Sequence, residues 1–337
     1  MQFIISRKLV FAGIFCIIFF GFVLAFLIDV THPPKGRTKP VLVEIHRGER
    51  FCEIVNMLHR ERLIRTKASF YLLSILRGVT HQIKAGEYEF PLNISTVSVL
   101  DKLVRGDIKR YRFVIPEDQT AHDIADRLAA LGLIDREEFI ALFEDKNFLV
   151  SLDIEGDTAE GFLYPETYYF DRSMGTRKIM VRMITEFWKH VTPAMQKRAQ
   201  TMGFSLQEWV TLASMIGRET GYKEEKILIS AVFHNRLKKG MKLQSDPTAV
   251  YNLKGFSGPI KRRHLNTSSP HNTYQIHGLP PGPIANPGLD SLQAALYPAA
   301  NNFLYFVSRN NGTHFFSTDY ASHNKAVKKY QVNGKKE

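Results

Sequence analysis

The run Leu9-Val-Phe-Ala-Gly-Ile-Phe-Cys-Ile-Ile-Phe-Phe-Gly-Phe-Val-Leu-Ala-Phe-Leu-Ile28 contains no charged residue. At about 1.5 Å per residue, twenty helical residues extend roughly 30 Å, which is the thickness of the hydrocarbon core of a bilayer. Large apolar side chains would cover every side of such a helix. The run therefore predicts one transmembrane helix over residues 9–28, preceded by a tail of residues 1–8.

A buried core helix and a cleaved signal peptide are the alternatives to a membrane anchor. A core helix of this length rarely lacks polar residues. A signal peptide has a shorter apolar region and a small-x-small cleavage site, whereas Ala25 is followed by three large apolar residues. The residues that precede the run, Arg7 and Lys8, hold the N-terminus in the cytoplasm by the positive-inside rule. We expect a single-pass protein of the inner (plasma) membrane, with everything after Asp29 periplasmic or otherwise extracytoplasmic.

The exterior part comprises roughly 300 residues, enough for one large domain or two. The net charge is +12, but the location outside the cytoplasm excludes nucleic acid as a partner. A basic excess favours an acidic membrane surface or an acidic polymer, although it is commonly only a solvated surface. The two cysteines, Cys16 in the predicted span and Cys52 outside it, cannot form a disulfide. The exterior core must therefore be stable from its own packing, and we expect it to need nothing from the membrane helix.

A weak internal repeat follows the anchor. Residues 29–40, which include the Pro- and Gly-rich HPPKGRTKP, are interpreted as a stalk. Behind them, VEIHRGERFCEI at 43–54 aligns with FVIPEDQTAHDI at 113–124, an offset of 70 residues that also pairs Leu58 with Leu128. Each copy predicts a strand, a turn and a helix with one apolar face. These β-α units resemble LysM-type wall-binding modules in outline, and a purely structural repeat is the alternative.

The remainder of the chain predicts mostly helices. The aromatic segment GFLYPETYYF at 161–170 suits a sugar-contacting wall or an ordinary core strand. A long irregular segment at 240–288 is functional or disordered by its length, and its aromatic residues argue for order. A hairpin over 303–317 precedes a last helix that begins near residue 318 and a basic tail. Four helices are predicted before the irregular segment, over residues 176–191, 193–202, 206–221 and 223–239.

The helix predicted over 206–221 carries the strongest chemical candidate, Glu219. Its apolar stripe comprises Leu206, Trp209, Val210, Ala213 and Ile216. Glu219 falls on the edge of this stripe, where partial desolvation favours the protonated carboxyl and raises its pKa. A general acid that works near neutral pH needs such a shift. The alternative interpretation is a surface glutamate at the end of a helix.

Polar residues in and after the next predicted helix are the candidates for ligand binding. Asn235 lies in the middle of the apolar face of that helix, and a buried amide must find hydrogen-bond partners. Those partners belong either to the protein's own backbone or to a polar groove. Farther on, Gln244 and Asp246 lie at a turn fixed by proline, and Asn272 and Tyr274 follow Pro270, ahead of the proline-rich stretch at 278–284.

Eight motifs in order resemble the endolytic murein transglycosylases, the YceG-like family. They are KAGEY at 84–88, EGFLYPETY at 160–168, LASMIGRET at 212–220, VFHNRL at 232–237, LQSDPT at 243–248, NTY at 272–274, GLPPGPIANPG at 278–288 and ASHNKAV at 321–327. The resemblance spans nearly the whole chain. It implies an α+β fold in which the N-terminal transmembrane helix precedes a LysM-like β-α module at 41–108 and a mixed α+β catalytic domain at 109–332.

The resemblance also implies an activity. It implies cleavage of the β-1,4 bond between N-acetylmuramic acid and N-acetylglucosamine within peptidoglycan glycan strands, which leaves 1,6-anhydro ends and terminates the elongation of nascent strands. Glu219 would act first as general acid and then as base, and the C6 hydroxyl of the substrate would be the nucleophile. No metal and no cofactor is required, and peptidoglycan synthases are candidate partners. The candidates for substrate binding are Asn235, Gln244, Asp246, Asn272 and Tyr274.

One position departs from the family pattern. Members often carry Glu-x-Glu in this helix, but the first position here is Gly217. A glycine inside a helix costs about 1 kcal/mol relative to alanine, and close helix packing would offset that cost. Because the motif offers one carboxylate, it favours a lyase over a hydrolase, which needs a second carboxyl group. Asp246 remains the candidate for that second group.

Two other classes of function remain as alternatives. The first is a non-catalytic, membrane-anchored scaffold that binds peptidoglycan. The second is a metalloenzyme, although the chain has no His-Glu-x-x-His motif. Its ligands would come from His234, His264, His271, His277, His314 and His323.

Overall fold

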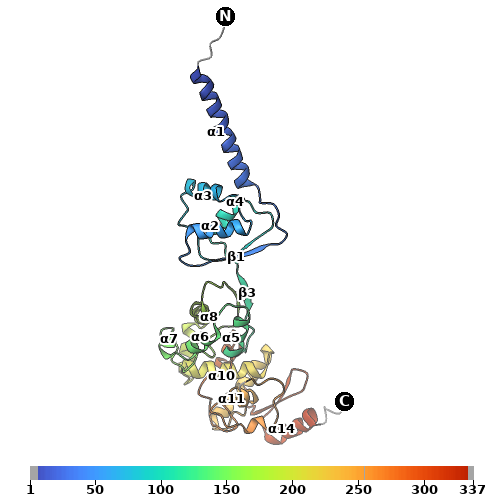
Figure 1. Ribbon diagram of the computed structural model, residues 1–337. Helices are drawn as coiled ribbons and strands as arrows, with labels where there is room; N and C mark the ends of the chain where they lie inside the picture. Colours follow the sequence, from blue (N-terminus) through green and yellow to red (C-terminus); the bar gives the residue numbers. More distant parts are fainter. Residues whose placement is uncertain (1–6, 254, 333–337) are drawn as a thin grey trace. The chain divides into compact units, whose positions relative to one another are not determined.

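The structure is a computed structural model that describes residues 7–253 and 255–332 (Figure 1). The chain forms two compact units. Unit 1 comprises Met1–Tyr111 and Asp171–Ser173, and unit 2 comprises Arg112–Phe170 and Met174–Glu337. Helices and short two-stranded sheets occur in both units, so the fold is mixed α+β, as predicted.

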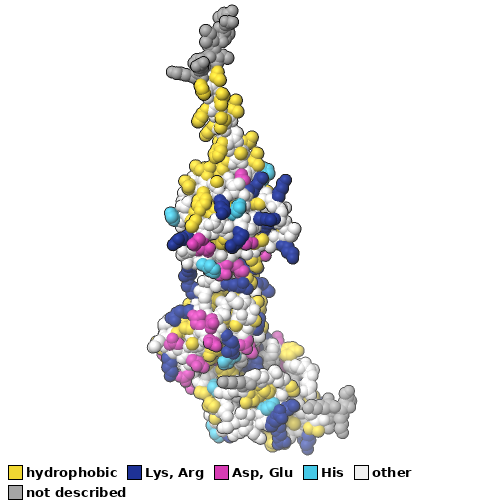
Figure 2. Space-filling view, in the orientation of Figure 1, with side chains coloured by type: hydrophobic (Ala, Val, Ile, Leu, Met, Phe, Trp, Pro, Cys, Tyr) yellow, Lys and Arg dark blue, Asp and Glu magenta, His cyan; other side chains and the backbone are white. Residues whose placement is uncertain are grey.

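The N-terminal apolar helix is α1 (Arg7–Thr31). Its segment Val10–Thr31 is long and apolar enough to cross a membrane, and none of the most apolar window of that segment is buried against the protein. Figure 2 shows apolar side chains along this helix. The first six residues of the predicted cytoplasmic tail lie outside the described residues. By length and composition, α1 is compatible with the predicted anchor.

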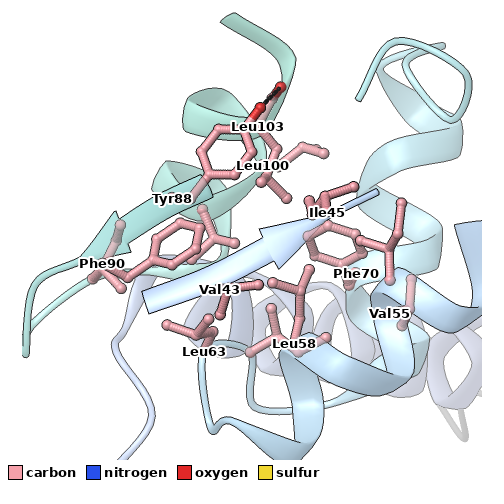
Figure 3. Close-up of a cluster of buried hydrophobic side chains, with 14 of the residues drawn as sticks. Val43, Ile45, Val55, Leu58, Leu63, Phe70, Tyr88, Phe90, Leu100 and Leu103 are labelled. Carbon is pink, nitrogen blue, oxygen red and sulfur yellow. Dashed lines mark hydrogen bonds between the residues drawn. The ribbon is translucent and has the colours of Figure 1, made fainter. Parts of the chain in front are cut away.

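Unit 1 packs three helices on a two-stranded sheet. Strand β1 (Val41–Ile45) pairs antiparallel with β2 (Gly86–Phe90), with Val43 opposite Tyr88. Val43 and Ile45 are buried, whereas the residue between them is exposed, as alternation along a strand requires. The sheet and the helices enclose one apolar core, which Figure 3 shows. The helices are α2 (Phe51–Arg60), α3 (Lys67–Leu76) and α4 (Thr96–Arg105).

The end of α1 belongs to this core. Val30 is 2% exposed and is part of the same apolar cluster, against which Phe26 also packs. Asp29 accepts a hydrogen bond of 3.0 Å from the Thr66 hydroxyl and lies 3.7 Å from the guanidinium of Arg65. The exterior core therefore has contacts with the end of α1, which the sequence did not predict, and its stability without α1 stays a prediction. Residues 32–40 connect two elements, α1 and the module, that already touch.

The internal repeat is confirmed at the level of secondary structure. Unit 1 has the order β1-α2-α3-β2-α4. The second copy has the same order and also pairs its two strands, but it carries one additional helix before the second strand. Its elements are β3 (Tyr111–Val114), α5 (Ala121–Ala130), α6 (Arg136–Phe143), α7 (Lys146–Val150), β4 (Thr167–Phe170) and α8 (Thr176–His190).

Local geometry repeats as well. Glu53 in α2 and Asp123 in α5 each accept the backbone N–H of the N-cap residue, at 3.1 and 3.2 Å. Such a bond satisfies a donor that has no partner within the helix. After each helix the chain turns through a left-handed residue, Arg62 (φ 53°) in the first copy and Gly132 (φ 65°) in the second. Both pairs keep the offset of 70 residues, so the two copies share their start and stop signals.

The rest of unit 2 is built around α10 (Leu206–Glu219), which is buried from Trp209 to Gly217. The indole N–H of Trp209 donates to the carbonyl of Leu292 at 2.9 Å and fixes α10 against α13 (Leu289–Leu296), a helix that was not predicted. The segment predicted as irregular, 240–288, contains α12 (Asp246–Val250) and a short 3-10 turn. The remaining elements are α9 (Pro193–Thr201), α11 (Lys223–Lys238), α12 (Asp246–Val250), α13 (Leu289–Leu296), β5 (Tyr305–Ser308), β6 (His314–Ser317) and α14 (Tyr320–Val327).

Candidate active site

Glu219 is the last residue of α10, where the buried helix reaches the surface. The residue is half-buried, between the exposed Arg218 and the buried Thr220. Its Oε1 accepts a hydrogen bond from the Ser245 hydroxyl. Among the described residues this is the one hydrogen bond recorded for the carboxyl group, so Oε2 stays available to a ligand.

The surroundings of Glu219 raise the pKa of its carboxyl group to about 7. Burial is the main cause, because it disfavours the charged form. The hydrogen bond from Ser245 acts in the opposite direction, as do the positive charges of Arg218 and Arg236, whereas the charge of Asp246 raises the pKa further. Near neutral pH both the acid and the carboxylate are therefore populated. This agrees with the desolvation expected from the apolar stripe.

A chain of buried hydroxyl groups holds Ser245. Its backbone N–H donates to the Thr273 hydroxyl at 2.9 Å, and the Thr248 hydroxyl donates to the Ser245 carbonyl at 2.6 Å. Because the single hydroxyl hydrogen of Thr248 is used in that bond, the Thr273 hydroxyl is the donor in the 2.8 Å contact between the two threonine hydroxyls. All three residues have no exposed surface. Ser245 was not among the predicted site residues, although its neighbours at 244 and 246 were.

Three of the predicted residues lie around Glu219. The Tyr274 hydroxyl donates to Asp246 Oδ1 at 2.5 Å, and both residues interact electrostatically with Glu219. Arg236 Nη1 donates to Gln244 Oε1 at 3.3 Å. The structure therefore brings Gln244, Asp246 and Tyr274 together with the candidate acid, and it adds Arg236, a buried cation that the sequence had not singled out.

The two asparagines serve the protein itself. Asn235 Nδ2 donates to the backbone carbonyls of residues 301 and 303, at 3.0 and 2.9 Å. Asn272 is fully buried, and its Nδ2 donates to the carbonyls of residues 265 and 267 at 3.0 and 2.6 Å. Its Oδ1 accepts the backbone N–H of Tyr274 at 3.0 Å. Of the two possibilities for Asn235, the structure shows the backbone role, and Asn272 orders the loop that carries Tyr274.

The histidines of the metalloenzyme alternative are not brought together. Within residues 7–253 and 255–332, no group of three or more His, Cys, Asp and Glu side chains has the arrangement of a metal site. His314 pairs with Glu225 at 2.7 Å, and His234 bonds to the carbonyl of Ala295 at 2.8 Å.

Gly217 touches a carboxyl group. A Cβ atom added there would lie 1.9 Å from Asp118 Oδ1, so the expected close packing is with this side chain. Asp118 adopts φ 64°, and its Oδ1 has no hydrogen-bond partner among the described residues. Burial raises its pKa to about 7, although the nearby Lys226 lowers it. No sequence pattern links Asp118 to α10, which lies about a hundred residues farther on, and sequence reasoning missed it.

Glu160 is a second buried acid of unit 2. Its Oε1 accepts from the Ala121 N–H at 2.9 Å and from Asn286 Nδ2 at 2.8 Å, and its Oε2 accepts from the Tyr251 hydroxyl at 3.0 Å. Burial raises its pKa to about 8. The bonds join α5 to two distant loops, so Glu160 holds the architecture beside the site.

A cavity of about 790 Å³ lies beside these residues, entirely within unit 2. Three of its lining residues are Arg218, Pro247 and His271. Each is the chain neighbour of a residue described above, because they adjoin Glu219, Asp246 and Asn272. One segment of the cavity wall therefore adjoins the candidate acid in the chain, although Glu219, Ser245 and Asp246 do not line the cavity.

Comparison with known proteins gives consistent results. The model of the YceG-like family matches residues 43–329. A Bacillus subtilis protein named endolytic murein transglycosylase is 30% identical over 312 residues, which are 88% of this chain and 86% of that protein. A Streptococcus pneumoniae protein of the same name is 26% identical over 94% of this chain, which spans 63% of its length. The crystal structure of a yceG-like protein from Listeria monocytogenes aligns with a TM-score of 0.60 at 29% identity, over 85% of this chain and 98% of that one.

Proposed function

The chain belongs to the YceG-like family and is a lytic transglycosylase, and we propose that it cleaves the β-1,4 bond between N-acetylmuramic acid and N-acetylglucosamine within peptidoglycan strands. Glu219 is the single acid and base of this reaction. The products are a strand that ends in 1,6-anhydro-N-acetylmuramic acid and a strand with a free 4-hydroxyl group on N-acetylglucosamine.

Protonated Glu219 first gives its proton to the glycosidic oxygen as the bond from C1 to that oxygen breaks. The C6 hydroxyl of the same muramic acid then attacks C1, and the Glu219 carboxylate takes the hydroxyl proton. The carboxyl group ends the cycle protonated, and no water is consumed. Because the attack is intramolecular, correct positioning of the sugar supplies much of the rate.

The observation that carries this proposal is the setting of the Glu219 carboxyl group. The Ser245 hydroxyl engages Oε1, which leaves Oε2 to exchange the proton with the substrate. A pKa of about 7 makes the acid and base forms comparably accessible, as one group acting in both steps requires. Gln244, Asp246 and Tyr274 are proposed to position the sugars.

A hydrolase is the second candidate, because the negative charge of Asp246 reaches Glu219. A hydrolase would use that second carboxylate to activate water or to attack C1 itself. Asp246 Oδ1 is instead engaged by the Tyr274 hydroxyl at 2.5 Å. We therefore assign Asp246 a positioning role and expect a lyase.

Digestion of purified glycan strands in water enriched in oxygen-18, followed by mass spectrometry, separates the two reactions. A lyase gives anhydro ends without label, and label in new reducing ends would overturn the single-carboxylate mechanism. Replacing Glu219 by Gln should lower turnover by about 100- to 10,000-fold, the typical contribution of general acid–base catalysis, while glycan binding persists. If the protein were a non-catalytic scaffold, this substitution would change neither turnover nor glycan binding.

The proposal extends to location and partners. Helix α1 anchors the chain once in the inner membrane with a cytoplasmic N-terminus, and the module of residues 41–108 is LysM-like and holds glycan. An anhydro end has no free reducing C1, so cleavage close to the membrane terminates nascent strands, and peptidoglycan synthases are the expected partners. A reporter fused to the C-terminus should be active only outside the cytoplasm, and activity inside would contradict this topology.

A further inference from the structure

Helix α3 of unit 1 is apolar on two sides. Its inner side packs on the core of the unit through Phe70 and Leu73, which are buried. On its outer side, Ile75 and Leu76 are 63% and 68% exposed. A helix that is apolar all round is normally enclosed by protein or by lipid. The described residues of this protein leave the outer side of α3 uncovered.

The apolar residues of the outer side form a continuous strip, because they lie about one helical turn apart. The α3 strip consists of Ala68, Leu72, Ile75 and Leu76. The hydroxyl of Ser74 does not interrupt it, since that hydroxyl is buried and donates to a carbonyl one turn earlier in the helix at 2.8 Å. No acidic residue occurs in α3. An exposed apolar surface of this kind marks a site of interaction.

Helix α1 brings α3 to the level at which the apolar run ends. Asp29 directly follows Ile28, the last residue of that run, and accepts a hydrogen bond of 3.0 Å from Thr66, the N-cap of α3. Phe26 lies inside the run and packs against the core of unit 1. At 1.5 Å per residue, Phe26 is about 3 Å inside the end of the run. If α1 spans a bilayer, unit 1 therefore meets the helix at the edge of the hydrocarbon.

The figures agree with this placement. Figure 1 shows α3 on the side of unit 1 where α1 enters, and Figure 2 shows hydrophobic side chains at this end of the unit. Helix α1 also contacts both α3 and α4. The apolar surface of α1 and the α3 strip are thus neighbours within one unit.

Basic residues flank the α3 strip. Lys67 begins the helix and Arg77 follows it, and both are exposed. Arg77 pairs with Asp101 of α4, whereas Lys67 forms no ion pair with any described residue. Long basic side chains lie along apolar surfaces while their charges reach polar surroundings. An apolar face with basic residues at its border is typical of a helix in the headgroup layer of a membrane.

We propose that the α3 strip lies in the headgroup layer of the membrane that α1 crosses, as a second lipid contact of unit 1. The inner side of α3 stays on the protein core, so the helix is held between that core and the lipid. This inference rests on the proposed membrane anchor and not on the cleavage reaction. A protein partner is the alternative occupant, but the nearness of α3 to the end of the apolar run favours lipid.

Fluorescence of a single label in nanodiscs tests the contact. The full chain, with Cys16→Ser and Cys52→Ser, carries the fluorophore NBD at Leu76→Cys. Leu42→Cys is the matched control, because Leu42 is also an exposed leucine of unit 1 but lies on β1 between residues that face the core or its edge. Each disc of phosphatidylcholine and phosphatidylglycerol in equal parts holds one chain. Lipids with a nitroxide at a known depth quench the fluorophore, and iodide quenches it from water.

We expect the label at Leu76→Cys to emit at shorter wavelength and to be quenched by a shallow nitroxide more than by a deep one. The label at Leu42→Cys should show neither effect and should be quenched by iodide. Adding Ile75→Asp to the Leu76→Cys chain should remove most of the lipid quenching, because a charge on the strip opposes its insertion. Ile75 is exposed, so this change leaves the core intact.

Two results would overturn the inference. One is equal quenching of the two labels by lipid and by iodide. The other is a blue shift at Leu76→Cys without lipid quenching, which would mean that protein covers the strip. A third chain, labelled at the native Cys16, tests the anchor separately with the deep nitroxide. Quenching at Cys16 but not at Leu76→Cys would refute the second contact alone, and quenching at neither would refute the anchor as well.

Discussion

Replacing Gly217 by Ala should destabilise unit 2, although alanine is the better helix former. In an exposed helix the change would gain about 1 kcal/mol. Here the new Cβ would lie 1.9, 2.5 and 2.8 Å from three atoms of the Asp118 carboxyl group. The carboxyl must move, and overpacking of this kind typically costs about 1–3 kcal/mol. We expect the net free energy of unfolding to fall by up to about 2 kcal/mol.

The sign should reverse when Asp118 is replaced by Gly. This second change removes the three atoms that the Cβ would meet, and glycine suits the positive φ of 64° at this position. In that background Gly217→Ala should stabilise the protein by about 1 kcal/mol. The coupling free energy between the two positions is then about 1–3 kcal/mol, within the range for residues in contact.

Urea unfolding followed by tryptophan fluorescence measures this coupling, because the two tryptophans of the chain, Trp188 and Trp209, both lie in unit 2. A shift of the midpoint at constant slope reports a change in stability alone. If Gly217→Ala stabilised both backgrounds equally, the contact with Asp118 would not exist in solution.

Three further predictions follow from the site and the core. Ser245→Ala should raise the pKa of Glu219, because the hydroxyl donor that it removes stabilises the carboxylate. The alkaline limb of the kcat–pH profile should then move to higher pH, and Ser245→Thr should restore the profile. An unmoved limb would exclude the hydrogen bond. Burial raises the pKa of Glu160 to about 8, so the folded state retains a proton that the unfolded state releases, and stability falls as pH rises from about 4.5 to 8. Glu160→Gln should therefore have a higher Tm than wild type at pH 9 and the same Tm at pH 4. Parallel curves of Tm against pH for the two proteins would contradict the assignment. Deleting residues 1–31 should destabilise unit 1 by about 2 kcal/mol relative to a chain that keeps residues 26–31, because Val30 is buried. Hydrogen exchange of the backbone amides in β1 and β2 measures the difference in stability. Equal protection of these amides in the two chains would refute the prediction.

Periodicity predicted much of the fold. The offset of 70 residues correctly anticipated the first strand and helix of each copy, since apolar spacing and turn residues are local signals. Helix α10 was predicted to within two residues at its end. By contrast, α12 and α13 were hidden in or beside a segment rich in proline and glycine, where short helices are stabilised by burial against α10 rather than by their own sequence.

The site was harder to predict than the fold. The motifs predicted that Glu219, Gln244, Asp246 and Tyr274 belong to one site. They could not predict the direction of each side chain, because residue type alone does not determine it. The amide of Asn272 could equally have faced a groove. Asp118 has no local signal at all, because its contact with α10 depends on the tertiary fold.

The burial of Val30 has a mechanical consequence. Because Val30 near the end of α1 is buried in the core of unit 1, bending between α1 and the module would have to break contacts of that core, whatever the length of the loop of residues 32–40. If α1 spans the membrane, this module stands at a constant height above the lipid headgroups. Inserting flexible residues into the loop would leave that height unchanged, whereas adding a turn to α1 before Phe26 would raise the module or pull the helix out of register with the bilayer. Folding, rather than the length of the loop, would then set the distance from the membrane at which the module binds a strand.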